Sequence, residues 1–236
     1  SRLLQIPYLL LNSLWRVSYP AMARHINTGG DGDEVVERVI GLSGLALGIL
    51  VAPLAASSTT AVPMLFGQRW AETGRLLVPI CAVLATTGAI SVGCAAFLSV
   101  TGRVRAMFIV TVANAATWLG ITLPLVRSMG AMAIPLGFAA ASSLESVGFA
   151  KLCRSESGAG PGTKAIRSAL PALIGGAAGF AVAQAIDHDV VATLASAGVA
   201  LAVTVIAGRL IDPDTSRELV ARVQAVAGRR GSAEAA

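Results

Sequence analysis

"AVPMLFGQRWAETGRLLVPI" (residues 61–80) joins two apolar runs through a short polar and aromatic corner. Long apolar stretches extend away from this corner in both directions along the chain. Gly67 can end a helix, and Trp70 beside Arg69 is the kind of side chain that anchors a membrane helix at the bilayer surface. The stretch therefore predicts two membrane helices joined by a turn at the interface.

The composition of the whole chain supports a membrane protein. Of its 236 residues 55% are hydrophobic and only 13% are charged, against about 25% charged in a soluble domain, and the mean hydropathy is +0.73. A hydrocarbon core of about 30 Å needs around 20 apolar residues per helix, about twice the length of a spanning strand. We therefore predict an all-α polytopic membrane protein of about seven transmembrane helices. The predicted spans are Leu3–Ala23, Val39–Phe66, Leu76–Val100, Ala106–Val126, Ala131–Ala150, Ser168–Ile186 and Val190–Gly208.

Basic residues are distributed unevenly between the connections of these helices. If the helices alternate in direction, one side of the membrane holds 13 of the 18 basic residues. The positive-inside rule makes that side cytoplasmic, and the C-terminal tail lies on it. We therefore expect a multi-pass protein of the bacterial cytoplasmic (inner) membrane with a cytoplasmic C-terminus.

The sequence indicates no enzyme, metal or other cofactor. His25 and His188 stand apart from cysteines and carboxylates at ligand spacing, and the three cysteines are interpreted as buried packing residues. The net charge of +5 follows from the loop asymmetry, and no basic stretch is interleaved with aromatic residues, so we expect no nucleic-acid partner.

Four short motifs resemble one transporter family. They are "SYPAMARH" (residues 18–25), "MLFGQRWAETGRLL" (64–77), "AAFLSVTGRVRAMF" (95–108) and "GAMAIPLGFAAAS" (130–142). In this order and spacing the chain resembles the polysaccharide-exporter branch of the MOP superfamily, the flippases for lipid-linked oligosaccharides, over residues 3–154. Each motif is weak alone, and their specificity lies in their order.

The resemblance implies an organisation of the chain. Residues 1–152 would be transmembrane helices of the C-terminal lobe of a flippase, and residues 153–163 a cytoplasmic linker. Residues 164–211 would be an additional helix pair, and residues 212–236 a cytoplasmic tail with an amphipathic helix at the membrane surface or a plain solvated helix. The remaining partner of this lobe would be the missing N-terminal half of the same transporter.

A polar stripe along the first predicted span suggests a hydrated cavity. At 100° per residue, its members fall on one face of the helix, and they are Gln5, Tyr8, Asn12, Arg16 and Tyr19. An arginine inside a membrane helix normally faces a cavity or a partner. Guanidinium pairs well with phosphate oxygens, so in the resembled flippases' substrate, a polyprenyl-pyrophosphate-linked oligosaccharide, Arg16 would bind the pyrophosphate. Asn12, Gln5 and Asn114 would contact sugar or water.

Two further positions carry hypotheses of their own. Thr111, Asn114, Trp118 and Thr122 share one face of the span at 106–126, which favours hydrogen bonds between helices over substrate contact. Glu145 is the one acid within an apolar run, near the predicted cytoplasmic end of its span. We favour its snorkelling toward Lys151 or Arg154, with ion coupling as the alternative.

The sequence thus predicts a flippase that translocates lipid-linked oligosaccharide among membrane lipids. A multidrug or small-solute exporter of the same superfamily would favour an acidic and aromatic cavity, against which Arg16 argues. A membrane glycosyltransferase would need long extracytoplasmic loops, and these are short here. A non-catalytic scaffold would use the polar stripes for packing alone.

Overall fold

The computed structural model describes residues 19–20, 22–26, 28, 31–157, 161–186, 189–221 and 224. Within these residues the chain is almost wholly helical and forms no strand, which confirms the all-α prediction. A short helix over residues 213–221, which we call the tail helix, follows the last long one. The other elements are α2 (Gly32–Phe66), η2 (Gln68–Trp70), α3 (Ala71–Val100), α4 (Val104–Met129), η3 (Gly130–Met132), α5 (Ala133–Ser157), α6 (Pro161–Ala185) and α7 (Asp189–Ile211).

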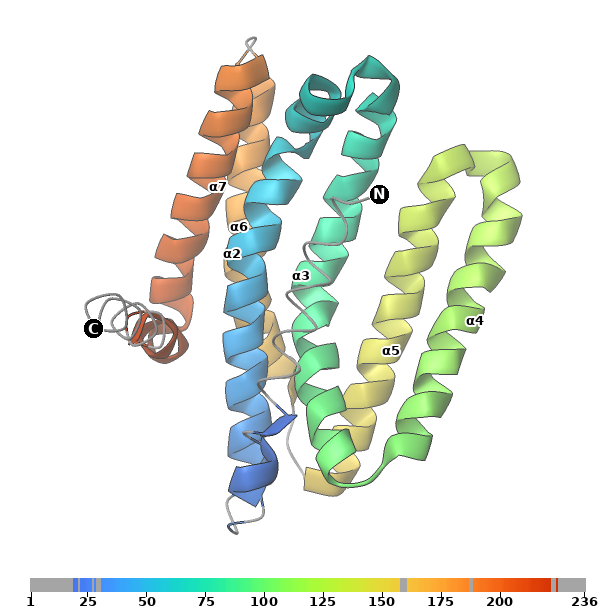
Figure 1. Ribbon diagram of the computed structural model, residues 1–236, viewed down its shortest axis with the longest axis vertical. Helices are drawn as coiled ribbons and strands as arrows, with labels where there is room; N and C mark the ends of the chain where they lie inside the picture. The colour runs from blue at the N-terminus through green and yellow to red at the C-terminus, as the bar shows by residue number, and fades with distance from the viewer. Residues whose placement is uncertain are drawn as a thin grey trace, which may run out of the picture.

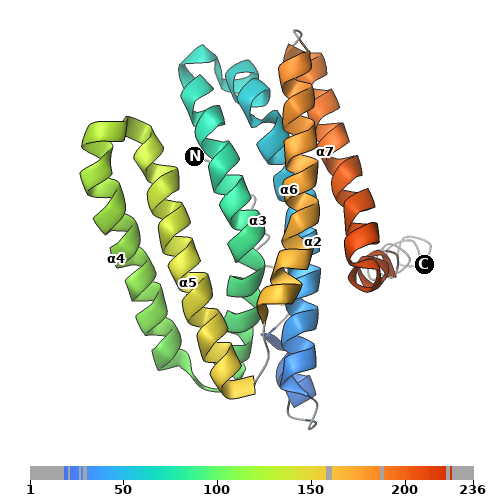
Figure 2. The same ribbon diagram turned by 180° about the vertical axis from the view of Figure 1, so that it is seen from behind.

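The six long helices run alternately up and down along one axis (Figure 1). α2 lies at the centre of a group with α3, α6 and α7, and α6 covers α2 in the reverse view (Figure 2). α4 and α5 form a hairpin at one edge of the molecule, and only α5 packs extensively against α3. The fold is therefore a four-helix group with an attached hairpin.

The helices that are long and apolar enough to cross a membrane form five candidate spans in the described part of the chain. This differs from the predicted count of about seven. The first predicted span, Leu3–Ala23, lies almost entirely outside the described residues. The predicted spans at 106–126 and 131–150 fall within one candidate, residues 104–156, because the helical backbone continues through η3 where the hairpin folds back. Positive φ at Gly130 (58°) lets the chain turn there.

The helices extend beyond the apolar runs that predict them. α2 begins at Gly32, seven residues before its predicted start, because the Asp31 carboxylate accepts from the Asp33 N–H at 2.9 Å and caps the helix. α5 continues to Ser157 and α6 begins at Pro161, so the connection is shorter than the predicted linker at 153–163. Proline is favoured in the first turn of a helix, which accounts for the start of α6.

The corner at residues 67–70 ends α2 as predicted. Gly67 has φ +90°, and its N–H donates to the carbonyl O of Pro63 at 2.8 Å. The Arg69 guanidinium lies 5.9 Å from the centre of the Trp70 ring, a cation–π distance. Both side chains are exposed, as an interfacial turn requires.

Small residues bring α2, α6 and α7 close together. A β-carbon on Gly48 of α2 would lie 2.9 Å from Ala172 Cβ of α6, and one on Gly179 of α6 would lie 2.5 Å from the carbonyl O of Ser196 of α7. Side chains of this size let helix backbones approach closely in membranes, where apolar burial gives little drive for association. α6 and α7 are thus packed into the same group as α2.

Candidate functional site

A cavity of about 430 Å³ lies between α3 and the α4–α5 hairpin. We call it the polar cleft, because six of its lining residues carry hydroxyl, amide or carboxyl groups. The polar lining residues are Thr87 and Ser91 of α3, Thr111 and Asn114 of α4, and Ser142 and Glu145 of α5. Two phenylalanines, Phe138 and Phe149, line it as well. The cleft therefore combines hydrogen-bonding groups with aromatic walls.

Glu145 is held by an amide from the neighbouring helix. Asn114 Nδ2 donates to Glu145 Oε2 at 3.0 Å. No lysine or arginine of the described chain forms an ion pair with Glu145, and the predicted partners Lys151 and Arg154 are not among its contacts. The carboxyl side chain is half-buried. The cleft thus holds an acid whose charge, when present, is not balanced by a described cation.

Glu145 lies at the middle of α5 as the whole helix runs, and five residues before the end of the apolar run that predicts the span. α5 runs from Ala133 to Ser157, so about 18 Å of helix lies on each side of Glu145 at about 1.5 Å per residue. The helix continues seven residues past that apolar run, and the placement of Glu145 near the cytoplasmic end of its span stays a prediction. An ionisable group within a membrane span is costly and usually functional.

Contacts between α3 and α5 fix the floor of the cleft. Ser146 Oγ, next to Glu145, donates to the carbonyl O of Thr87 at 3.4 Å. Further along, Cys153 Sγ donates to the carbonyl O of Cys94 at 3.8 Å, and both thiols are fully buried. Phe149 packs into the same cluster. These contacts set the rotation of α5 that turns Glu145 into the cleft.

The polar residues predicted to share one face of α4 fall into two groups, one that lines the cleft and one that packs against α5. Thr111 and Asn114 line the cleft. Trp118 and Thr122 instead contact α5, where a β-carbon on Gly137 would collide with Thr122 Oγ1 and lie 3.2 Å from Trp118 Cδ1. Asn114 satisfies both interpretations of the stripe, since it joins two helices and also faces the cleft.

The polar stripe predicted on the first span cannot be placed. Gln5, Tyr8, Asn12 and Arg16 lie outside the described residues. Tyr19 is described and partly exposed, and it is not part of the lining of the cleft. The site that the structure shows therefore contains Thr111, Asn114 and Glu145 of the predicted residues, with Trp118 at the adjacent contact between α4 and α5.

Sequence reasoning missed the contribution of α3. Thr87 and Ser91 of α3, like Ser142 of α5, are small hydroxyl residues inside apolar runs, and such residues can also bond to their own helix backbone. Thr87 does so, since its Oγ1 donates to the carbonyl O of Val83 at 2.8 Å. The available signal was their spacing: Thr87 and Ser91 are four residues apart and lie on one face of a helix.

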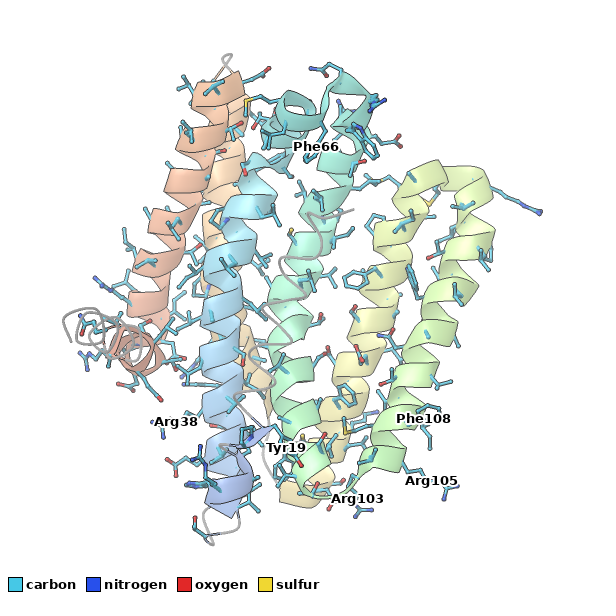
Figure 3. All side chains as sticks on the ribbon, in the orientation of Figure 1. Tyr19, Arg38, Phe66, Arg103, Arg105 and Phe108 are labelled. Atoms are coloured by element: carbon cyan, nitrogen blue, oxygen red, sulfur yellow. The ribbon has the colours of Figure 1, made fainter. Side chains whose placement is uncertain are left out.

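The end of the molecule that carries α2's start holds most of the described arginines and lysines. Figure 3 shows Arg38, Arg103 and Arg105 at this end and Phe66 at the other. Arg103 pairs with Glu156 there, and Arg38 Nη2 lies 2.8 Å from Glu218 Oε1 of the tail helix. The described charges thus follow the asymmetry seen in the sequence.

An ion pair attaches the start of the tail helix to α6. Lys164 Nζ lies 3.0 Å from Asp212 Oδ2, and the Thr215 N–H donates to Asp212 Oδ1 at 3.4 Å. Burial alone would raise the pKa of Asp212, but the hydrogen bonds from Lys164 and Thr215 outweigh it and hold that pKa below its usual value. Among the described residues no group of three His, Cys, Asp or Glu side chains could hold a metal ion.

Comparisons of the chain with protein-family models, with curated proteins and with solved structures find no match. A function for the polar cleft must therefore be argued from its own residues and from the short motifs of the sequence.

Proposed function

We propose that this chain forms one lobe of a membrane transporter, and that the transporter is a flippase for polyprenyl-pyrophosphate-linked oligosaccharide. The observation that carries the proposal is the polar cleft, which lies along helices of membrane-spanning length and places Glu145 midway along one of them. The chain would act without catalysis and would work with an N-terminal half of the same transporter.

The cleft has the chemistry that a sugar headgroup needs. Four hydroxyl side chains, one amide and one carboxylate face a space of about 430 Å³. Polar groups left without partners in hydrocarbon cost several kcal/mol each. Thr87 bonds to its own helix backbone and Asn114 bonds to Glu145, and water or a polar substrate would serve the remaining hydrogen-bonding capacity of the lining. Sugar hydroxyls both donate and accept, and they match such a lining. The lipid tail of the substrate would remain in the bilayer beside the hairpin.

The motifs support the choice of substrate. "MLFGQRWAETGRLL" and "AAFLSVTGRVRAMF" resemble corners of the flippase family. By that resemblance Arg16 would bind the pyrophosphate, with Gln5, Tyr8, Asn12 and Tyr19 on the same predicted helix face. The chain would then supply the family's C-terminal lobe together with the additional helix pair, about seven helices in all.

Glu145 is the residue through which an ion gradient would act. Its carboxyl can carry a proton or a cation, and Asn114 would hold it facing the cleft in either state. Because one wall of the cleft comes from α3 and the others from the hairpin, a change of charge at Glu145 would bias how closely the hairpin packs against α3. Coupling ions act in this way by favouring one arrangement over another.

Export of lipid-linked oligosaccharide in cells carrying the full-length gene tests the proposal. Glu145→Gln and Asn114→Ala should lower surface glycan by about tenfold or more, because a hydrogen bond to a charged group contributes roughly 1.5–3 kcal/mol. Glu72→Gln is the matched control, since Glu72 is exposed near the opposite end of α3. Arg16→Ala should also abolish export, with partial restoration by Arg16→Lys. Undiminished export by Glu145→Gln at normal protein level would refute the role of the cleft.

One observation favours a second candidate, an exporter of small organic cations. The described lining of the cleft holds an acid and two phenylalanines and no basic side chain. Cations are attracted by carboxylates and by aromatic faces. If this candidate is correct, Glu145→Gln would raise the susceptibility of cells to cationic drugs and leave surface glycan unchanged.

A further inference from the structure

The tail helix lies across the long axis of the molecule and is seen almost end-on in both views (Figures 1 and 2). Three contacts hold it: Arg38 pairs with Glu218, Lys164 pairs with Asp212, and Thr215 is buried beside Gly41. A helix perpendicular to a membrane bundle, at the end with most basic residues, runs parallel to the bilayer surface. This is the geometry of an interfacial helix.

An apolar groove of about 200 Å³ lies between the tail helix, α2 and α7. Its walls include Leu45 and Ile49 of α2, Val205 of α7, and Leu219 and Val220 of the tail helix. Val205 is six residues before the end of α7, about 9 Å along the helix axis. The groove therefore reaches from the interface into the depth of one leaflet's acyl chains.

One arginine lines the groove, and a second lies on the tail helix one turn from the lining residue Val220. Arg209 lines the groove and is exposed. Arg217 is also exposed and lies three residues before Val220, on the same flank of the tail helix. The tail helix also carries two acids. Glu218 pairs with Arg38, and Asp214 is exposed on the flank away from Val220. An apolar groove next to positive charge at a membrane surface fits a molecule with an acyl chain and an anionic head.

We propose that the groove binds one anionic glycerophospholipid of the cytoplasmic leaflet, with an acyl chain along Val205 and Val220 and its phosphate at Arg209 and Arg217. The lipid would complete the packing of the tail helix against α2 and α7. This site is separate from the polar cleft, which lies on the other side of the four-helix group between α3 and the hairpin. It depends on the membrane location of the chain and not on the transported substrate.

Native mass spectrometry of the purified full chain in detergent tests the site. The probes are dioleoylphosphatidylglycerol, which is anionic, and dioleoylphosphatidylcholine, which has no net charge and the same acyl chains. The wild type should bind one phosphatidylglycerol more tightly than phosphatidylcholine. R209Q/R217Q should weaken phosphatidylglycerol binding by about 25-fold, roughly fivefold for each arginine, and should weaken phosphatidylcholine binding much less, because the choline cation offsets the phosphate charge.

Two further variants make the test specific. R69Q/R75Q removes two arginines from the opposite end and should bind both lipids as the wild type does. Val205→Trp fills the groove and should weaken binding of both lipids, with a thermal midpoint measured alongside to show that the chain is folded. Equal binding of the two lipids by the wild type, or R209Q/R217Q equal to R69Q/R75Q, would overturn the proposal. So would binding that is seen only after deletion of residues 226–236, because the chain's own end would then occupy the groove.

Discussion

Adding a single methyl group at Gly175 should separate α6 from α7. A β-carbon there would lie 2.6 Å from the carbonyl O of Ala200 and in collision with Thr204 Oγ1. Ordinary contacts begin at 3.4 Å, so α7 must move by about 0.8 Å, which forfeits a quarter to a half of the local dispersion attraction. Overpacking of this kind costs about 1–3 kcal/mol.

The neighbouring Gly176 provides a matched control. A β-carbon on Gly176 would meet nothing closer than Ala52 Cα at 3.9 Å. Both substitutions gain the same intrinsic helix propensity, at most about 1 kcal/mol, so this gain cancels in their comparison. Gly175→Ala should therefore have a free energy of unfolding about 1–3 kcal/mol below that of Gly176→Ala.

Thermal unfolding followed by circular dichroism in detergent measures this difference. In a chain of this length 1 kcal/mol shifts the midpoint by about 2–4 °C. Adding Thr204→Ala to Gly175→Ala should restore only part of the loss, because the Ala200 carbonyl remains in place. Identical midpoints for Gly175→Ala and Gly176→Ala would show that α6 and α7 do not approach each other as described.

Three other predictions concern the helix ends and the sidedness of the chain. The pKa of Asp212 is lower in the folded chain than its unfolded value of about 3.9, so its stabilisation is complete above that value and is lost as the pH falls through the folded pKa. The protection of the amides of residues 213–221 from hydrogen exchange, relative to the intrinsic rate at each pH, should be constant from neutral pH to about 4 and lower below it. Asp212→Asn should show low protection at all these pH values. Asp31→Ala removes the N-cap of α2 and should cost about 1 kcal/mol in a thermal unfolding measurement. Cysteines at Arg217 and Arg75 should react with impermeant thiol reagents from opposite sides of the membrane, the first from the cytoplasm, and labelling from one side would contradict the assigned topology.

The helices could be predicted from hydropathy because a membrane segment must be apolar over its full span and must satisfy its own backbone. The ends of the helices could not be predicted in this way. Polar flanks such as residues 32–38 and 151–157 continue the helix beyond the apolar run, and capping residues and helix propensity decide where the helix ends there. The fold-back at Gly130 was visible as a short break between apolar runs. The effect of this fold-back on the number of candidate spans was not visible in the sequence, because the helical backbone continues through η3.

The site was harder to predict than the fold. Asn114 and Glu145 are 31 residues apart, and their meeting depends on how the hairpin is rotated, which Gly137 and the Ser146 contact with α3 decide. Residue spacing shows which side chains share one face of a helix, but it does not show which face of another helix packs against them. Thr87 and Ser91 illustrate the limit, since an isolated hydroxyl in an apolar run carries no signal of what it faces.

The most direct test of the account is the reactivity of a cysteine placed in the polar cleft. Ser91→Cys is placed in a full-length chain whose native cysteines, Cys81, Cys94 and Cys153 among them, are replaced by alanine. It is treated with a membrane-impermeant methanethiosulfonate, with Leu119→Cys on the exposed apolar face of α4 as control. We predict that Ser91→Cys reacts, that added lipid-linked oligosaccharide slows the reaction, and that Leu119→Cys stays unlabelled. If Ser91→Cys is as unreactive as Leu119→Cys, or if the substrate gives no protection, the cleft is not the path of the substrate and its polar residues serve packing alone.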